Sequence, residues 1–365
     1  VNGAAGGLPK YFMDFDTAYA KASDRFIRHY LNYNMYPIDK NTGTYTASIQ
    51  DRLDLFINYN WLEDNDGTHY DPNKYKYVGL LPAQLSAQEI EVPLIVTLCV
   101  AAEQYVNNTG GTLSLVDGDH RRRPPTPDEI KAMGNISLAY GAKGFMYYMV
   151  PTRTAQPLNG KTEFNQYGLY EEVNSAFDPS DPDTWVQNPA ALQVPNNRYT
   201  AVQEFIASTS LIDSTLLRLR WLGAEGWNRD DQCTIDWITN LSTKYPHFAT
   251  YDDSNKTFVE TGYFTEINPP SGKVEDAKFI YLVNRRCNLQ PANSPDNLED
   301  YPDTSYRNVS FNLNFPNSNW NYYTIRDLKT DSVYFASKTG LVTIFLGAGE
   351  GTLLKIEPQI TIITQ

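Results

Sequence analysis

The chain has 365 residues, and its hydrophobic content of 41% argues for a packed core and against global disorder. Its formal net charge is −13 at pH 7, which argues against a nucleic-acid-binding protein because phosphate contacts need clustered lysine and arginine. No apolar run approaches the roughly 18 residues that a membrane helix needs, so we expect no membrane span.

The first part of the chain alternates between helical and strand-like segments. A long polar loop is expected over 103–124, and a second long loop over 151–197. Alternation of this kind predicts right-handed βαβ units and a parallel sheet. The expected elements, in order, are helix 13–28, strand 29–37, helix 46–60, short helix 80–91, strand 92–101, helix 127–141, strand 142–150 and helix 198–218.

One helix start is defined by its sequence. Thr126 precedes Pro127, and Glu129 follows three residues after Thr126, which is the pattern of a capping box with proline in the first turn. Gly141 suits the C-terminal end of the same helix. We therefore expect Glu129 to cap the helix rather than to take part in chemistry.

After about residue 220 the chain consists of short alternating segments separated by turn residues. Seven or so such strands predict an antiparallel β-sandwich. Within them Asp327 is expected to make a turn. The segments are TFVETGYF, AKFIYLVNR, NVSFNLNF, YYTIRDL, SVYFAS, LVTIFL and GTLLKIE.

Aromatic residues are frequent, with 26 Tyr, 16 Phe and 6 Trp. Sugar rings stack on flat aromatic faces, so this composition suits a glycan-binding protein, although packing in a β-rich protein would explain it equally well. The 4 His are scattered and no CxxC occurs, so we expect no metal site and no cofactor. Cys99 is expected to be a buried thiol, and a disulfide between Cys233 and Cys287 is conceivable.

Several segments resemble a known family. RRRPPTPDEIKAMGNISLAYGAKGFMYYMV (121–150) resembles the last helix–strand unit of a glycoside-hydrolase TIM barrel, and HYLNYNMYPI (29–38) resembles an earlier strand of such barrels. The segment 197–221 is similar to the closing helix. GYFTEI, AKFIYLVNR, IRDLKTDSVYF and LVTIFLGAGEGTLLKIE are similar to the C-terminal β-sandwich of β-galactosidase-like hydrolases.

This resemblance implies an α/β plus all-β fold, with the C-terminal (β/α) units of a TIM barrel followed by an antiparallel β-sandwich. Residues 1–225 would form the partial barrel and residues 226–365 the sandwich. The strands at 29–37, 92–101 and 142–150 would be the sixth, seventh and eighth barrel strands, so five strands would be missing. Another chain, or an N-terminal barrel half, would have to cover the open sheet. The resemblance and the acidic composition also imply a secreted or cell-surface protein.

TIM-barrel active sites form at the carboxyl ends of the strands, which gives a set of candidate residues. Aromatic residues in the following loops, among them Tyr167 and Tyr170, could wall a glycan cleft. The candidate substrate-binding residues are Tyr33, Asn34, Tyr36, Trp61, Gln104, Tyr147 and Tyr148.

Glycoside hydrolysis normally needs two carboxylates that flank the scissile bond. The resemblance makes Glu103, the carboxylate directly after the seventh strand, the candidate catalytic residue, while the strand that would carry the acid/base has no counterpart. Two hypotheses stay open. The chain is a glycoside hydrolase or a fragment of one, acting on a poly- or oligosaccharide, or it is a non-catalytic glycan-binding or structural surface protein that assembles with a partner chain.

Overall fold

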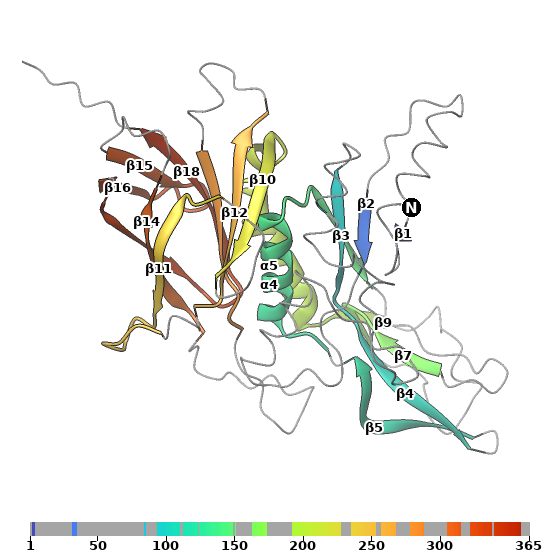
Figure 1. The fold of residues 1–365 in the computed structure, drawn as a ribbon. Coiled ribbons are helices and arrows are strands. Elements are labelled where there is room, and N and C mark those ends of the chain that lie inside the picture. Colours follow the sequence, from blue (N-terminus) through green and yellow to red (C-terminus); the bar gives the residue numbers. More distant parts are fainter. Residues whose placement is uncertain are drawn as a thin grey trace, which may run out of the picture.

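The structure is a computed structural model, and it describes residues 2–3, 31–34, 84, 93–109, 112–122, 124–148, 150, 163–173, 192–227, 235–252, 257–267, 278–287, 305–314, 322–337 and 339–358. These residues form a parallel sheet, a layer of helices, a β-sandwich and two small antiparallel sheets (Figure 1). None of the described helices combines the length and apolarity that crossing a bilayer requires.

The parallel sheet has four strands in chain order. They are β1 (Asn2–Gly3), β2 (Leu31–Asn34), β3 (Leu94–Cys99) and β6 (Gly144–Tyr148). All three pairings between neighbours are parallel, so the predicted parallel arrangement is confirmed. β1 was not predicted. A complete TIM barrel has eight such strands, so the full barrel stays a prediction.

The helices lie on one face of this sheet. α4 (Pro127–Ala139) begins with the predicted capping box: the Glu129 amide donates to Thr126 Oγ1 at 3.1 Å and the Thr126 amide donates to Glu129 Oε2 at 2.7 Å. Gly141, just past the helix end, has the positive φ of 79° that glycine tolerates. These contacts confirm both predicted ends of α4.

The expected helix 198–218 is interrupted. The structure has α5 (Asn197–Ser210) and then the short α6 (Asp213–Leu216). The break places Ile212 in the core with no exposed surface, while the preceding Leu211 stays 62% exposed. Burial of Ile212 is therefore the physical reason for the change in direction.

The polar segment 103–124 is not a loop, contrary to our expectation. It forms most of β4 (Ala102–Thr109) and β5 (Thr112–Arg122), and β4 also pairs with β7 (Glu163–Tyr167). Thr109 lies opposite Thr112, with two glycines between them in the sequence. Such glycine pairs favour a tight hairpin connection. β8 (Tyr170–Val173) and β9 (Leu192–Pro195) form a further pair inside the second expected loop.

The C-terminal part is an antiparallel β-sandwich, as predicted. One sheet has the order β10-β12-β13-β18-β15-β16 and the other the order β11-β14-β17. The strands are β10 (Leu219–Gly226), β11 (Ile238–Lys244), β12 (Val259–Glu266), β13 (Lys278–Asn284), β14 (Arg307–Leu313), β15 (Tyr322–Asp327), β16 (Val333–Ser337), β17 (Leu341–Leu346) and β18 (Gly351–Pro358).

β10 lies across the limit that we expected between the two domains, at residue 225. It starts at Leu219 and pairs with β12 of the sandwich. Leu219 and Trp221 of this strand are also buried in the core that holds the helices. β10 therefore contributes to both parts of the fold, and the division at residue 225 stays a prediction.

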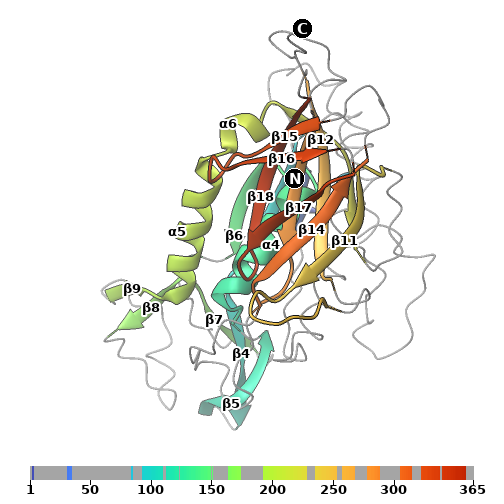
Figure 2. The ribbon, with the colours of Figure 1, turned by 90° about the vertical axis from the view of Figure 1, so that its left-hand side faces the viewer.

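The elements stack in four layers: the parallel sheet, the helices, the six-stranded sheet and the three-stranded sheet (Figure 1). Figure 2 looks along this stack from the sandwich side, with β11, β14 and β17 toward the viewer. β13 shows how one strand serves two cores. Phe279 and Tyr281 pack with α4, whereas Ile280 and Leu282 pack in the interior of the sandwich. α4 is therefore enclosed by sheet on both sides, which explains why ten of its residues are buried.

Candidate functional site

The carboxyl ends of the parallel strands meet along one edge of the sheet. Asn34 at the end of β2 pairs with Thr97 of β3, and Cys99 at the end of β3 pairs with Tyr148 at the end of β6. Polar residues at such strand ends are brought together by topology alone. This edge, which we call the carboxyl edge, is the place where the sequence predicted a site.

The two faces of the sheet differ at this edge. Leu94, Val96 and Leu98 of β3 belong to the core beneath the helices, so the alternating Thr97 lies on the opposite face of the strand. In β6, Phe145 contacts Phe205 of α5 with ring centroids 5.3 Å apart and therefore points to the helices.

Tyr147 and Tyr148 consequently lie on opposite faces of β6. Tyr147 packs against the helix-side core, and its burial raises the pKa of its hydroxyl to about 12. Tyr148 alternates with it and shares the face of Thr97. Of the two tyrosines predicted to bind substrate, the structure places only Tyr148 on the face of the carboxyl edge that points away from the helices.

Glu103 and Gln104 lie at the start of β4, close after the carboxyl end of β3. The Val100 amide donates to the Tyr148 carbonyl at 2.8 Å, so the chain is still tied to β6 as it leaves the sheet. Glu103 is paired through its backbone with Gln166 on one side and Arg122 on the other. The candidate carboxylate thus belongs to a strand rather than a loop, and its side chain lies outside the described part of the chain.

The remaining predicted residues are placed only in part. The backbone of β2 carries Tyr33 opposite Val96, next to Asn34. Tyr36 and Trp61 lie outside the described residues.

A short segment before β8 completes the carboxyl edge, and sequence reasoning missed what holds it. Arg198 Nη2 and Asn196 Nδ2 donate to the Gly168 carbonyl at 2.7 and 2.9 Å. The Leu169 amide donates to the Val150 carbonyl at 2.8 Å. The polar start of α5 thereby fixes this segment against the end of β6, and the Asn196 cap was the only sequence signal for it.

Two aromatic residues predicted to follow the strand ends do reach this region. Tyr167 ends β7 opposite Ala102, next to the Glu103–Gln166 pair. Tyr170 stacks edge to face on Tyr199 of α5, with ring centroids 5.1 Å apart. The carboxyl edge thus brings tyrosine rings close to the backbone of Asn34, Glu103 and Gln104, which are the amide and carboxyl residues of the predicted site.

The chemistry open to this edge follows from these groups. Among the described residues no cluster of His, Cys, Asp and Glu could hold a metal ion. Cys99 is buried, and its thiol donates to the Ala101 carbonyl at 3.5 Å, as the buried-thiol prediction required. The Cys287 thiol is likewise buried and donates to the Arg285 carbonyl, while its conceivable partner Cys233 lies outside the described residues.

Neither a protein-family model nor a curated protein matches this chain. Among solved structures it is similar to an Anoxybacillus α-amylase, with a TM-score of 0.24 and 12% identity, over 64% of this chain and 34% of the amylase. It is similar to a GH27 β-L-arabinopyranosidase from Geobacillus stearothermophilus, with a TM-score of 0.28 and 9% identity, over 79% of this chain and 56% of the other.

A third similar structure is a Bacillus halodurans protein assigned as an α-N-acetylgalactosaminidase. Its TM-score is 0.24 and its identity 7%, over 92% of this chain and 98% of that protein. The chain therefore spans about a third of the amylase and just over half of the arabinopyranosidase. All three likenesses are weak.

Proposed function

We propose that this chain is the C-terminal part of a carbohydrate-active protein of glycoside hydrolase type, and that it contacts a poly- or oligosaccharide at the carboxyl edge. One observation carries the proposal: the ends of β3 and β6, the start of β4 and the end of β7 converge at that edge. The helix–strand motif at 121–150, which resembles the last unit of a glycosidase barrel, ends there.

Tyr148 is the residue that we expect to contact sugar. It ends β6, lies on the face of the sheet that points away from the helices and has a partly exposed side chain. A tyrosine ring offers an apolar face for a pyranose ring and a hydroxyl for hydrogen bonding. Tyr167 would extend the aromatic wall on the β7 side.

Hydrolysis, as distinct from binding, would need Glu103 and a second carboxylate about 5 Å away for retention or farther for inversion. The two activities are separable in one experiment. Binding of soluble oligosaccharides is measured by titration calorimetry, and release of reducing sugar is measured on the same panel. The proteins are wild type, Tyr148→Ala and Glu103→Gln, with Tyr322→Ala and Glu357→Gln as exposed controls on the sandwich.

We expect Tyr148→Ala to weaken binding roughly tenfold, as loss of an aromatic contact does, with Tyr322→Ala unchanged. Loss of hydrolysis in Glu103→Gln with binding retained would identify Glu103 as catalytic. Binding by wild type without hydrolysis would favour the non-catalytic alternative, a surface protein whose open sheet is covered by a partner chain. A wild-type protein that binds no glycan would refute the proposal. A location outside the cell belongs to the same proposal.

A further inference from the structure

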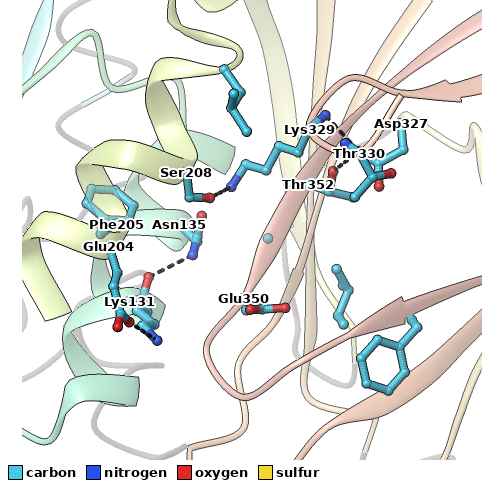
Figure 3. A pocket seen from close by; sticks show the side chains of 14 residues that line it. Lys131, Asn135, Glu204, Phe205, Ser208, Asp327, Lys329, Thr330, Glu350 and Thr352 are labelled. Carbon is cyan, nitrogen blue, oxygen red and sulfur yellow. Dashed lines mark hydrogen bonds and ion pairs between the residues drawn. The ribbon is translucent and has the colours of Figure 1, made fainter. Parts of the chain in front are cut away.

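A polar cavity lies on the side of the helix layer that faces the sandwich. Its volume is about 340 Å³, and it is lined by α4 and α5 on one side and by the sandwich on the other (Figure 3). The sandwich contributes the turn after β15 and the segment between β17 and β18. Cavities of this size hold small organic ligands in other proteins.

Lys329 is the main hydrogen-bond donor of this cavity. Its side chain runs from the turn after β15 toward α5, and Nζ donates to Ser208 Oγ at 2.9 Å (Figure 3). Burial lowers the pKa of this ammonium group to about 8, while the nearby Glu350 and Asp327 act in the opposite direction. An ammonium group has three N–H donors, so Lys329 can donate to a ligand as well as to Ser208.

Carboxylates supply the acceptors. Glu350 is exposed, and its Oε2 accepts from the Gly347 amide at 2.9 Å. Glu204 is paired with Lys131 at 2.7 Å across the mouth formed by α4 and α5. Asp327 is held in place because its Oδ1 accepts from the amides of Lys329 and Thr330 and from the Thr352 hydroxyl. Three carboxylates and two ammonium groups therefore line one small cavity.

Because carboxylates and ammonium groups line the cavity together, neither a simple anion nor a simple cation fits it well. An anion would meet three carboxylates, and a cation would meet two ammonium groups. A neutral molecule with several hydroxyl groups can accept from the lysines and donate to the carboxylates. We propose that this cavity binds a neutral polyhydroxylated molecule, a mono- or disaccharide, as a second site distinct from the carboxyl edge.

The test uses the whole chain and named probes: glucose, galactose, arabinose and maltose, with inorganic phosphate as the anion. Saturation-transfer NMR and titration calorimetry measure binding to wild type, Lys329→Met and Glu350→Gln. Lys355→Met is the matched control, since Lys355 lies in the sandwich on β18 and pairs with Glu357. Glu350→Gln keeps the test decisive if Lys329→Met does not fold, because Glu350 is exposed.

We expect saturable binding of at least one sugar that both cavity variants weaken tenfold or more and that Lys355→Met leaves unchanged. Tyr148→Ala should leave this binding intact, so failure here is distinguishable from failure of the carboxyl-edge proposal. The inference is overturned if no probe sugar binds, if Glu350→Gln and a folded Lys329→Met bind as wild type does, or if phosphate binds more tightly than every sugar.

Discussion

Gly262 lies where β12 of the sandwich packs directly against the end of α4. A Cβ atom placed there would lie 2.0 Å from the Ala139 carbonyl oxygen at the end of α4. The neighbour is backbone and cannot rotate away, so β12 or α4 would have to move. We predict that Gly262→Ala lowers the free energy of unfolding by about 3 kcal/mol, measured by urea denaturation.

Gly144→Ala is the control for this substitution. A Cβ at Gly144 would meet only the Cδ1 methyl of Ile95, at 2.8 Å, and that methyl can change rotamer. An equal loss of stability in both variants would show that the backbone contact at Gly262 is not what forbids a side chain there.

Lys143 should give the stability a recognisable pH dependence. Its Nζ donates to the carbonyls of Leu216 and Leu219, and burial lowers its pKa from 10.5 to about 8. Between these pH values the unfolded chain holds the proton that the folded chain has released, so stability rises with pH. The rise is at most about 3 kcal/mol.

The measurement compares wild type with Lys143→Met by chemical denaturation from pH 7 to 9.5. The free energy of unfolding of wild type should increase relative to that of Lys143→Met as the pH rises through 8. Tyr147 acts with the opposite sign, since its raised pKa makes stability fall above about pH 10, and it is common to both proteins. A pH-independent difference would mean that Lys143 titrates normally.

At the scale of elements, the buried amide side chain of Asn135 links α4 to the sandwich. Asn135 Nδ2 donates to the Gly349 carbonyl at 2.8 Å, and the Tyr281 hydroxyl donates to Asn135 Oδ1 at the same distance. Asn135→Ala would leave both partners buried without these bonds. We predict a loss of about 3 kcal/mol, with a double-mutant cycle against Tyr281→Phe showing coupling of about 1 kcal/mol.

Ser137→Ala is the matched control for Asn135→Ala. Ser137 is equally buried, but its hydroxyl donates only within α4, to the Met133 carbonyl at 2.7 Å. Its loss should cost about 1 kcal/mol. Zero coupling between Asn135 and Tyr281 would contradict the bridging role.

The sequence predicted those features whose pattern lies within a few neighbouring residues. The capping box at Thr126 and Glu129, and the turn at Asp327 whose carboxylate accepts from two following amides, are local and were predicted correctly. The β4–β5 hairpin was missed because its strands are polar, although two glycines separate them. Polar strands lack the apolar alternation that identifies a half-buried strand.

The strand ends that define the candidate site were predicted, while the site itself stays a prediction. Strand ends can be read from buried apolar runs, and the structure pairs the ends of two such runs at Cys99 and Tyr148. The sequence did not predict that Tyr147 and Tyr148 point to opposite faces in this way, because that depends on which side of the sheet the helices cover. The cavity between the helices and the sandwich was not predictable, because Lys131, Glu204 and Lys329 come together only through packing of the helices on the sandwich.

At the scale of the molecule, α4 joins two sheets in one core. Leu98 of β3, Ile136 of α4 and Phe279 of β13 belong to the same buried cluster. Neither the parallel sheet nor the six-stranded sheet can lose α4 without exposing apolar side chains to water. We therefore expect the described layers to unfold in one cooperative transition despite their different fold classes.

Ile136→Ala tests this expectation, with hydrogen exchange as the measurement. Ile136 is fully buried, so the truncation should cost about 3 kcal/mol. Amides of β3 and β13 should lose protection by the same factor, because both strands would exchange through the same global opening. Ile206→Ala, at a 50% exposed position of α5, should leave both unchanged. If amides of β3 lose protection and those of β13 do not, the sandwich unfolds independently. In that case α4 stabilises the parallel sheet alone.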